Sequence, residues 1–175
     1  MDSIWQFQEN ISGIIVMGSA ASVHDGHKWQ DDITDLLLES FDKSIPVMGI
    51  CYGHQLLAHI CGGRVGPLWN GKKEQGQRKV SVMENSLWGK ARNGQMIYSH
   101  QDGVTQCPDD FEITAVSDMV SVDGFVNKTK PIWGFQTHIE ATQAFIDNHN
   151  IPIANHQETF AFGHQILDSF ILSLA

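Results

Sequence analysis

Short apolar runs and an amphipathic segment alternate along the first third of the chain. Residues 13–17 (GIIVM) and 45–50 (IPVMGI) are apolar and are ended by glycine or a turn, a pattern typical of strands buried on both faces. Between them, residues 31–41 place isoleucine, leucine and phenylalanine at helical spacing, and Asp31 or Asp32 is the expected N-cap. The predicted order is strand, helix, strand.

A second helix is predicted directly after the second strand. It covers residues 52–60 and ends at Gly62 and Gly63, which suit a left-handed C-cap. Later strands are predicted at residues 79–83, 95–98, 111–116 and 132–136, and a closing amphipathic helix at residues 157–174. This alternation favours an α/β fold with a largely parallel sheet that is covered by helices on both faces.

Length, charge and cysteine content limit the kinds of function that the protein can have. With 175 residues, 42% of them hydrophobic, the chain can bury one good core, and we expect residues 1–175 to form a single domain. The net charge of −9 offers no basic surface to nucleic acid or an anionic membrane, which favours a small-molecule substrate. No apolar run approaches the roughly 18 residues of a membrane span, and no signal peptide is visible, so a cytoplasmic protein with three reduced cysteines is expected.

The most informative residues about function lie where the second strand meets the second helix. There, Cys51 stands between Gly49 and Gly53, which is the spacing of a nucleophile elbow. Side chains two positions either side of such a sharp turn would collide, so glycine has a steric reason at both places. The helix N-terminus stabilises a thiolate and is expected to lower the pKa of Cys51. The pattern predicts a cysteine nucleophile rather than a small buried hydrophobe.

A cysteine nucleophile needs a histidine that moves protons and a third group that orients this histidine. Residues 136–140 (QTHIE) supply both groups, because the side chains of an extended segment alternate with period two. Gln136, His138 and Glu140 therefore point the same way. His138 is the expected base and Glu140 its orienting partner.

In these residues and in several other segments, the chain resembles the class I glutamine amidotransferases, particularly stand-alone members similar to the amidotransferase domain of GMP synthase. The matching segments, in order, are residues 18–23 (GSAASV), 49–55 (GICYGHQ), 74–76 (EQG), 99–104 (SHQDGV) and 136–140 (QTHIE). The resemblance implies a flavodoxin-like fold and hydrolysis of the glutamine side-chain amide through a thioester on Cys51.

The resemblance also implies roles for further residues. The backbone amides of Tyr52 and of the Gly18–Ser19 turn would stabilise the tetrahedral oxyanion, and Gln55 would hold the amino-acid end of the substrate. Gln101 and Asp102 would line the glutamine pocket. Serine stands at position 19 where the family usually has glycine, but its backbone can still donate a hydrogen bond.

Other functions remain open at this point. A γ-glutamyl peptidase or hydrolase would use the same triad, and a catalytically silent binding domain would keep the fold. A zinc site at His24 and His27, or at His54 and Cys61, is disfavoured by the lack of zinc-finger spacing, so no metal and no cofactor are expected. No phosphate-binding glycine loop with lysine is present, so an ammonia-accepting synthetase would be another protein.

Family members normally carry a strand, a helix and a strand before the first strand predicted here, roughly 30 or more residues. Only 12 residues precede Gly13. The resemblance therefore implies that this first unit is missing and that residues 14–17 form an apolar sheet edge. We expect a second copy or another partner to cover the edge, or the chain to be a truncated form of a longer protein.

Overall fold

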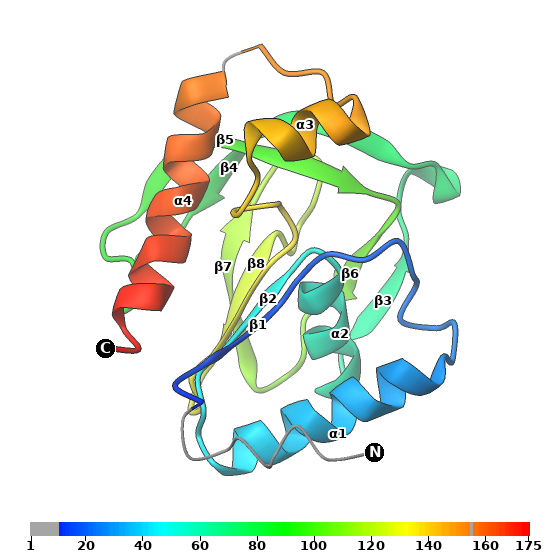
Figure 1. Ribbon diagram of the computed structural model, residues 1–175, viewed down its shortest axis with the longest axis vertical. Coiled ribbons are helices and arrows are strands. Elements are labelled where there is room, and N and C mark those ends of the chain that lie inside the picture. Colours follow the sequence, from blue (N-terminus) through cyan, green and yellow to red (C-terminus); the bar gives the residue numbers. More distant parts are fainter. Residues whose placement is uncertain (1–10, 155) are drawn as a thin grey trace.

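The two apolar runs of the first half form neighbouring parallel strands at one end of a seven-stranded sheet. In the computed structural model, which describes residues 11–154 and 156–175, β1 (Ile14–Val16) pairs with β2 (Val47–Ile50), and β2 pairs on its other side with β9 (Ile132–Phe135) (Figure 1). All three strands are parallel. β2 is completely buried, as its apolar sequence predicts.

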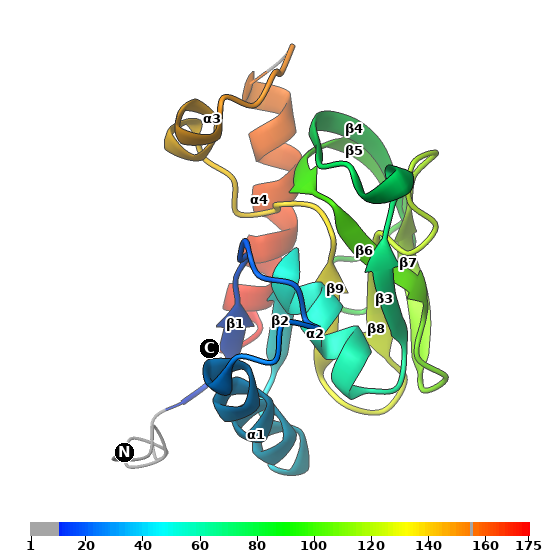
Figure 2. The ribbon, with the colours of Figure 1, turned by 90° about the vertical axis from the view of Figure 1, so that its right-hand side faces the viewer.

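The rest of the sheet pairs in the antiparallel sense, in the order β9-β8-β7-β4-β5. These strands are β8 (Gly124–Asn127), β7 (Phe111–Val116), β4 (Glu74–Val82) and β5 (Arg92–His100). A separate antiparallel pair, β3 (Arg64–Pro67) and β6 (Asp102–Gln106), lies next to α2 (Tyr52–Ile60) (Figure 2). The α/β class is confirmed, and the sheet is mixed: among the described strands, β1, β2 and β9 pair in parallel and the other neighbours pair in the antiparallel sense.

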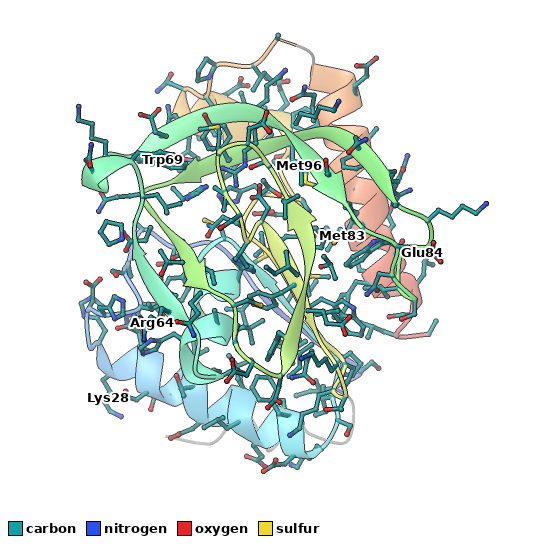
Figure 3. All side chains as sticks on the ribbon, turned by 180° about the vertical axis from the view of Figure 1, so that it is seen from behind. Lys28, Arg64, Trp69, Met83, Glu84 and Met96 are labelled. Atoms are coloured by element: carbon teal, nitrogen blue, oxygen red, sulfur yellow. The ribbon has the colours of Figure 1, made fainter. Side chains whose placement is uncertain are left out.

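Helices cover both faces of the sheet. The side chains of β2 accordingly alternate between two apolar cores, one on each face. Val47 faces the core that contains Leu37 of α1 (Lys28–Asp42) and residues of α2. Met48 and Ile50 face a second core with Phe170 of α4 (His156–Leu172). Figure 1 shows α4 on one side of the sheet and α1 and α2 on the other, and the side chains that fill the spaces between them are drawn in Figure 3.

Several sequence predictions need correction. The N-cap of α1 is His27, four residues before Asp31, because the side chain of Gln30 accepts a hydrogen bond from the His27 amide (2.8 Å) and closes the first turn. The short elements with few periodic apolar positions were not predicted: β3, β6, β8, the 3-10 turn Trp69–Gly71 and α3 (Gln143–His149). The predicted end of α2 is confirmed, since Gly62 has φ +88°.

The predicted sheet edge is present in the part of the chain that the structure describes. There β1 pairs with β2 alone. Residues 1–10, which precede it, lie outside the described residues. None of the described helices is long and apolar enough to cross a membrane.

Candidate active site

Cys51 occupies a strained turn between β2 and α2. Its backbone has φ 53° and ψ −100°, which side-chain-bearing residues rarely adopt. A Cβ at Gly49 would lie 2.6 Å from the backbone of Gly53, and a Cβ at Gly53 would lie 2.1 Å from the carbonyl oxygen of Val16. The elbow therefore requires glycine at both positions, as the sequence predicts.

His138 and Glu140 meet next to this thiol. The Nδ1 of His138 lies 2.8 Å from Oε1 of Glu140, and the His138 amide donates to the carbonyl oxygen of Ile97 on β5. Cys51 and His138 line the same cavity, and the interaction with the Cys51 side chain raises the pKa of His138. The structure thus brings together the three residues that the sequence predicts as a triad, although β9 ends at Phe135 and the segment beyond it is irregular.

The imidazole of His138 favours its protonated form. Burial alone would lower the pKa of His138, but the hydrogen bonds and the negative charges of Cys51 and Glu140 outweigh burial and raise this pKa to about 10. The ring of Phe145 on α3 packs against the imidazole, with ring centroids 4.5 Å apart. An imidazolium held beside a sulfur atom can donate a proton to a leaving group there.

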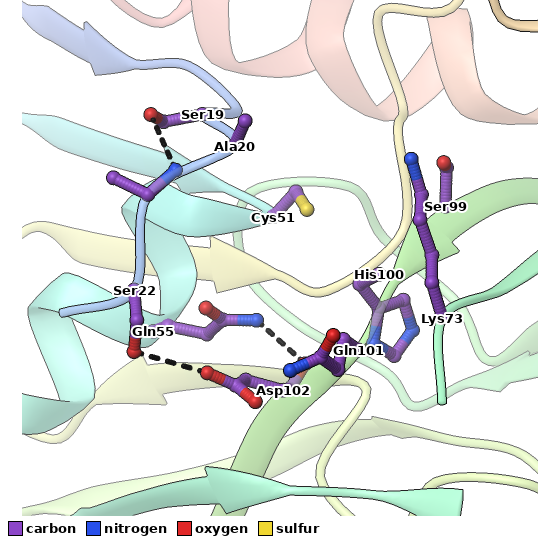
Figure 4. Close-up of a pocket in the computed structure, with 11 residues that line it drawn as sticks. Ser19, Ala20, Ser22, Cys51, Gln55, Lys73, Ser99, His100, Gln101 and Asp102 are labelled. Carbon is purple, nitrogen blue, oxygen red and sulfur yellow. Dashed lines mark hydrogen bonds between the residues drawn. The ribbon is translucent and has the colours of Figure 1, made fainter. Parts of the chain in front are cut away.

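The loop after β1 contacts both reactive side chains. A Cβ at Gly18 would lie 2.9 Å from Cε1 of His138 and 3.7 Å from Cβ of Cys51. Ser19 and Cys51 line one cavity, and the Ser19 hydroxyl accepts a hydrogen bond from the Ala21 amide (3.1 Å), which closes a tight turn (Figure 4). Tyr52 is the first residue of α2, so its backbone N–H is among those that a helix leaves unpaired.

A cavity of about 210 Å³ lies on one side of the thiol. The residues that the sequence predicts to bind substrate line this cavity. The side-chain amide of Gln55 donates to the carbonyl oxygen of Asp102 (2.7 Å), and the hydroxyl of Ser22 donates to the Asp102 carboxylate (3.0 Å) (Figure 4). Gln101 lines the same cavity. Ser22 therefore connects the loop after β1 to the opposite wall, a role that its sequence position alone did not reveal.

A second cavity, of about 410 Å³, opens on the other side of Cys51. Its lining includes His138 and Glu140, together with Thr142, Phe145 and His149 of the α3 region. The two cavities share Cys51 and the loop that precedes α1. The Cys51 thiol thus stands between two spaces, with His138 on the larger one.

Sequence reasoning did not assign a site role to Gln136. This side chain is fully buried, its Nε2 lies 3.8 Å from Sγ of Cys51, and its Oε1 accepts a hydrogen bond from Gln55 (3.3 Å). The signal was available, since Gln136 shares the period-two face of His138 and Glu140. Glu74, by contrast, is exposed at the start of β4 and lines neither cavity.

The other two thiols, and His24 and His54, line neither cavity. Burial raises the pKa of the Cys61 thiol to about 11 and raises that of Cys107, so both stay in the less reactive protonated form. Nε2 of His24 contacts the carbonyl oxygen of Val65, and His54 is buried against Phe125. Among the described residues, no three His, Cys, Asp or Glu side chains gather as a metal ion requires.

Comparison with known proteins identifies the family. The model of the family "Glutamine amidotransferase class-I" matches residues 1–153. The chain belongs to this family. The GMP synthase [glutamine-hydrolyzing] of Ligilactobacillus salivarius is 39% identical over 135 residues, which are 75% of this chain and 25% of that protein. The enzyme of the same name from Borreliella burgdorferi is 33% identical over 168 residues, 94% of this chain and 28% of that protein.

Solved structures of amidotransferases share the fold. A GMP synthase-type protein from Thermoplasma acidophilum matches with a TM-score of 0.74 and 26% identity, covering 95% of this chain and 74% of that chain. A glutamine amidotransferase from Methylobacillus flagellatus matches with a TM-score of 0.75 and 19% identity, covering 94% and 77%. The flavodoxin-like fold implied by the sequence resemblance is confirmed. The chain spans about a quarter of the length of the GMP synthases that it matches.

Proposed function

We propose that the chain hydrolyses the side-chain amide of glutamine to glutamate and ammonia. The observation that carries this proposal is the contact of Cys51 with the His138–Glu140 pair, at an elbow that opens onto a cavity containing Asp102. Family membership supports it. The chain matches about a quarter of the length of relatives that are named glutamine-hydrolyzing.

In the proposed reaction, the thiolate of Cys51 attacks the amide carbon of glutamine and forms a C–S bond. The oxyanion that develops is stabilised by the backbone amides of Tyr52 and of the Gly18–Ser19 turn, a contribution of about 3 kcal/mol per donor. His138 donates its proton to the amide nitrogen, the C–N bond breaks and ammonia leaves. A water molecule then attacks the thioester while His138 accepts its proton, the C–S bond breaks, and glutamate leaves, which restores the Cys51 thiolate beside the protonated His138.

The substrate would lie with its amino-acid end in the smaller cavity. The carboxylate of Asp102 is suited to a positively charged α-amino group, and Gln55 and Gln101 add polar contacts there. Glu140 accepts from Nδ1 of His138, which directs the other ring nitrogen to proton transfer. In this arrangement the leaving nitrogen faces the larger cavity, where His138 stands.

The larger cavity favours a second candidate function. Ammonia needs far less room than about 410 Å³, so this space also suits a larger leaving amine, as in γ-glutamyl peptides. Alternatively, an ammonia-accepting synthetase partner would dock over it, since the matching GMP synthases extend well beyond the length of this chain. Comparing the release of ammonia from glutamine with that of amines from γ-glutamyl peptides separates the two activities.

A glutamine-like diazo-ketone tests the nucleophile. Stoichiometric modification of Cys51 is expected, because the pocket delivers the reactive carbon to this thiol, and Cys61 and Cys107 should react much more slowly because burial raises their pKa values. Mass spectrometry of the digested protein measures the modification at each site. The Cys51→Ser variant serves as the control and should remain unlabelled. Preferred modification of Cys61 or Cys107 would disprove the assignment.

Replacement of Gly18 by alanine tests the loop after β1. The added Cβ would lie 2.9 Å from the His138 ring, so the imidazole must shift and glutamine turnover should fall about 100-fold. The free energy of unfolding should change by less than about 1 kcal/mol, because the ring can yield where a backbone cannot. Gly66→Ala is the matched control, since the nearest atom to its Cβ is 3.9 Å away. Equal turnover in the Gly18→Ala variant and the parent would contradict the prediction.

A further inference from the structure

A buried charged cluster reaches the wall of the smaller cavity through His100, which lines it, and the proposed reaction does not use the cluster directly (Figure 4). Nη1 of Arg78 on β4 lies 2.9 Å from Nε2 of His100, the last residue of β5, and Nη2 of Arg78 forms an ion pair with Asp123. All three side chains are at least 95% buried. A buried ion pair is weak evidence of a stabilising role, because an apolar replacement is often as stable. The contacts of His100 indicate a different role.

The hydrogen bonds of this cluster fix the tautomer of His100. A guanidinium group can only donate hydrogen bonds, so Nε2 of His100 must accept from Arg78 and carry no proton. The ring proton of the neutral imidazole is therefore on Nδ1, which donates to the carbonyl oxygen of Asp102 (2.8 Å). Burial and the adjacent Arg78 charge lower the pKa of His100 to about 3, which agrees with a neutral ring. The ring of Trp69, labelled in Figure 3, packs against His100 with centroids 4.9 Å apart.

Asp102 lines the cavity beside His100 and is hydrogen-bonded to it. Its carbonyl oxygen accepts two hydrogen bonds, one from His100 and one from Gln55 on α2, while its carboxylate accepts from Ser22. Two segments distant in sequence, those of Ser22 and Gln55, and the neighbouring His100 therefore fix a single residue. Of these three contacts, only the one from His100 connects Asp102 to the buried Arg78–Asp123 ion pair.

We propose that Arg78 and His100 are positioning residues of the substrate pocket. Arg78, anchored on Asp123, fixes the tautomer of His100, and His100 fixes the Asp102 carbonyl group and with it the Gln101–Asp102 wall of the cavity. The cluster acts on substrate affinity and not on the chemical step, since no member contacts Cys51 or His138 through a hydrogen bond that the structure shows among its described residues. This inference rests on the proposed function, because the pocket is assigned to the glutamyl group.

Two substitutions of His100 separate a positioning role from a merely structural one. In His100→Asn, the side-chain amide nitrogen can occupy the place of Nδ1 and still donate to Asp102. In His100→Gln, the amide lies nearer the place of Nε2, and the donor to Asp102 is lost. The His100→Gln variant should raise the KM for glutamine roughly five- to tenfold, the size expected for one lost hydrogen bond, with kcat within about twofold of the parent. His100→Asn should restore KM to within about twofold of the parent.

The labelling of Cys51 provides a second readout of the pocket. The concentration of diazo-ketone at half-maximal labelling rate should rise for His100→Gln in parallel with KM. The rate with iodoacetamide, which needs no glutamyl pocket, should stay the same. If both His100 variants raise KM equally, or if His100→Gln leaves KM and half-saturation unchanged, the inference is overturned. If the parent is not labelled by the diazo-ketone, the proposed function fails and the inference fails with it.

The double variant Arg78→Met/Asp123→Leu tests whether the Arg78–Asp123 ion pair is needed to position His100. It removes both buried charges together, so neither is left unpaired. It should raise KM about as much as His100→Gln does, and adding His100→Gln should change KM little further, because both changes disrupt one linkage. Additive effects on KM would overturn the role of Arg78. Circular dichroism establishes that the double variant is folded, and if it is not, the two His100 variants decide.

Discussion

Replacement of His138 by alanine is expected to lower kcat for glutamine about 1,000-fold or more, because in the proposed reaction this residue both protonates the leaving nitrogen and activates the attacking water. Glu140→Ala should lower kcat less, by about 10- to 100-fold, since the carboxylate orients and stabilises the imidazole without transferring the proton itself. Initial rates of ammonia release at saturating glutamine measure both effects.

His59→Ala is a suitable control for these variants. His59 lies on the same helix that follows the nucleophile, but it is exposed and lines neither cavity. Its replacement should leave kcat unchanged. Equal activity of His138→Ala and the parent would show that the base lies elsewhere.

The largest loss of stability is expected from Gly53→Ala. The new Cβ would lie 2.1 Å from the carbonyl oxygen of Val16 and 2.8 Å from its carbonyl carbon, so α2 and β1 would have to separate. A backbone group on a paired strand cannot move aside as a flexible side chain does. The free energy of unfolding should fall by about 3 kcal/mol or more, which lowers the melting temperature by roughly 10 °C in a chain of this size.

Urea denaturation followed by circular dichroism measures this change. Gly66→Ala again supplies the control, because the nearest atom to its Cβ is a methyl group at 3.9 Å and its loss of stability should stay below about 1 kcal/mol. A Gly53→Ala variant as stable as the control would show that the elbow tolerates a side chain and that the close packing of α2 on β1 is not required.

The features predicted correctly from the sequence are those that short-range patterns encode. The buried strand β2 follows from a run of apolar residues, and the elbow follows from two glycines whose spacing has a local steric cause. His138 and Glu140 were predicted together because they are two residues apart, although the segment after β9 is irregular and not extended. The members of each pair, Gly49 with Gly53 and His138 with Glu140, lie within a few residues of one another.

The features that the sequence did not reveal depend on long-range pairing. Arg78 and Asp123 are 45 residues apart and meet because β4 and β8 belong to one sheet. Likewise, Ser22 and Asp102 are 80 residues apart and become neighbours only when the loop after β1 folds over the cavity. No periodicity marks these positions. Polar residues in short strands resemble loop residues until the tertiary partner is known.

The two sides of the candidate site differ in how firmly the sheet secures them. Cys51 follows β2, which is hydrogen-bonded on both sides, whereas Gly18 follows β1, which pairs with β2 alone among the described strands. Opening the loop after β1 therefore breaks one set of ladder hydrogen bonds, and displacing the elbow breaks two. Transient opening of the site should thus begin at β1. We therefore expect the lifetime of the proposed thioester to depend on the dynamics of the edge strand, while Cys51 stays fixed.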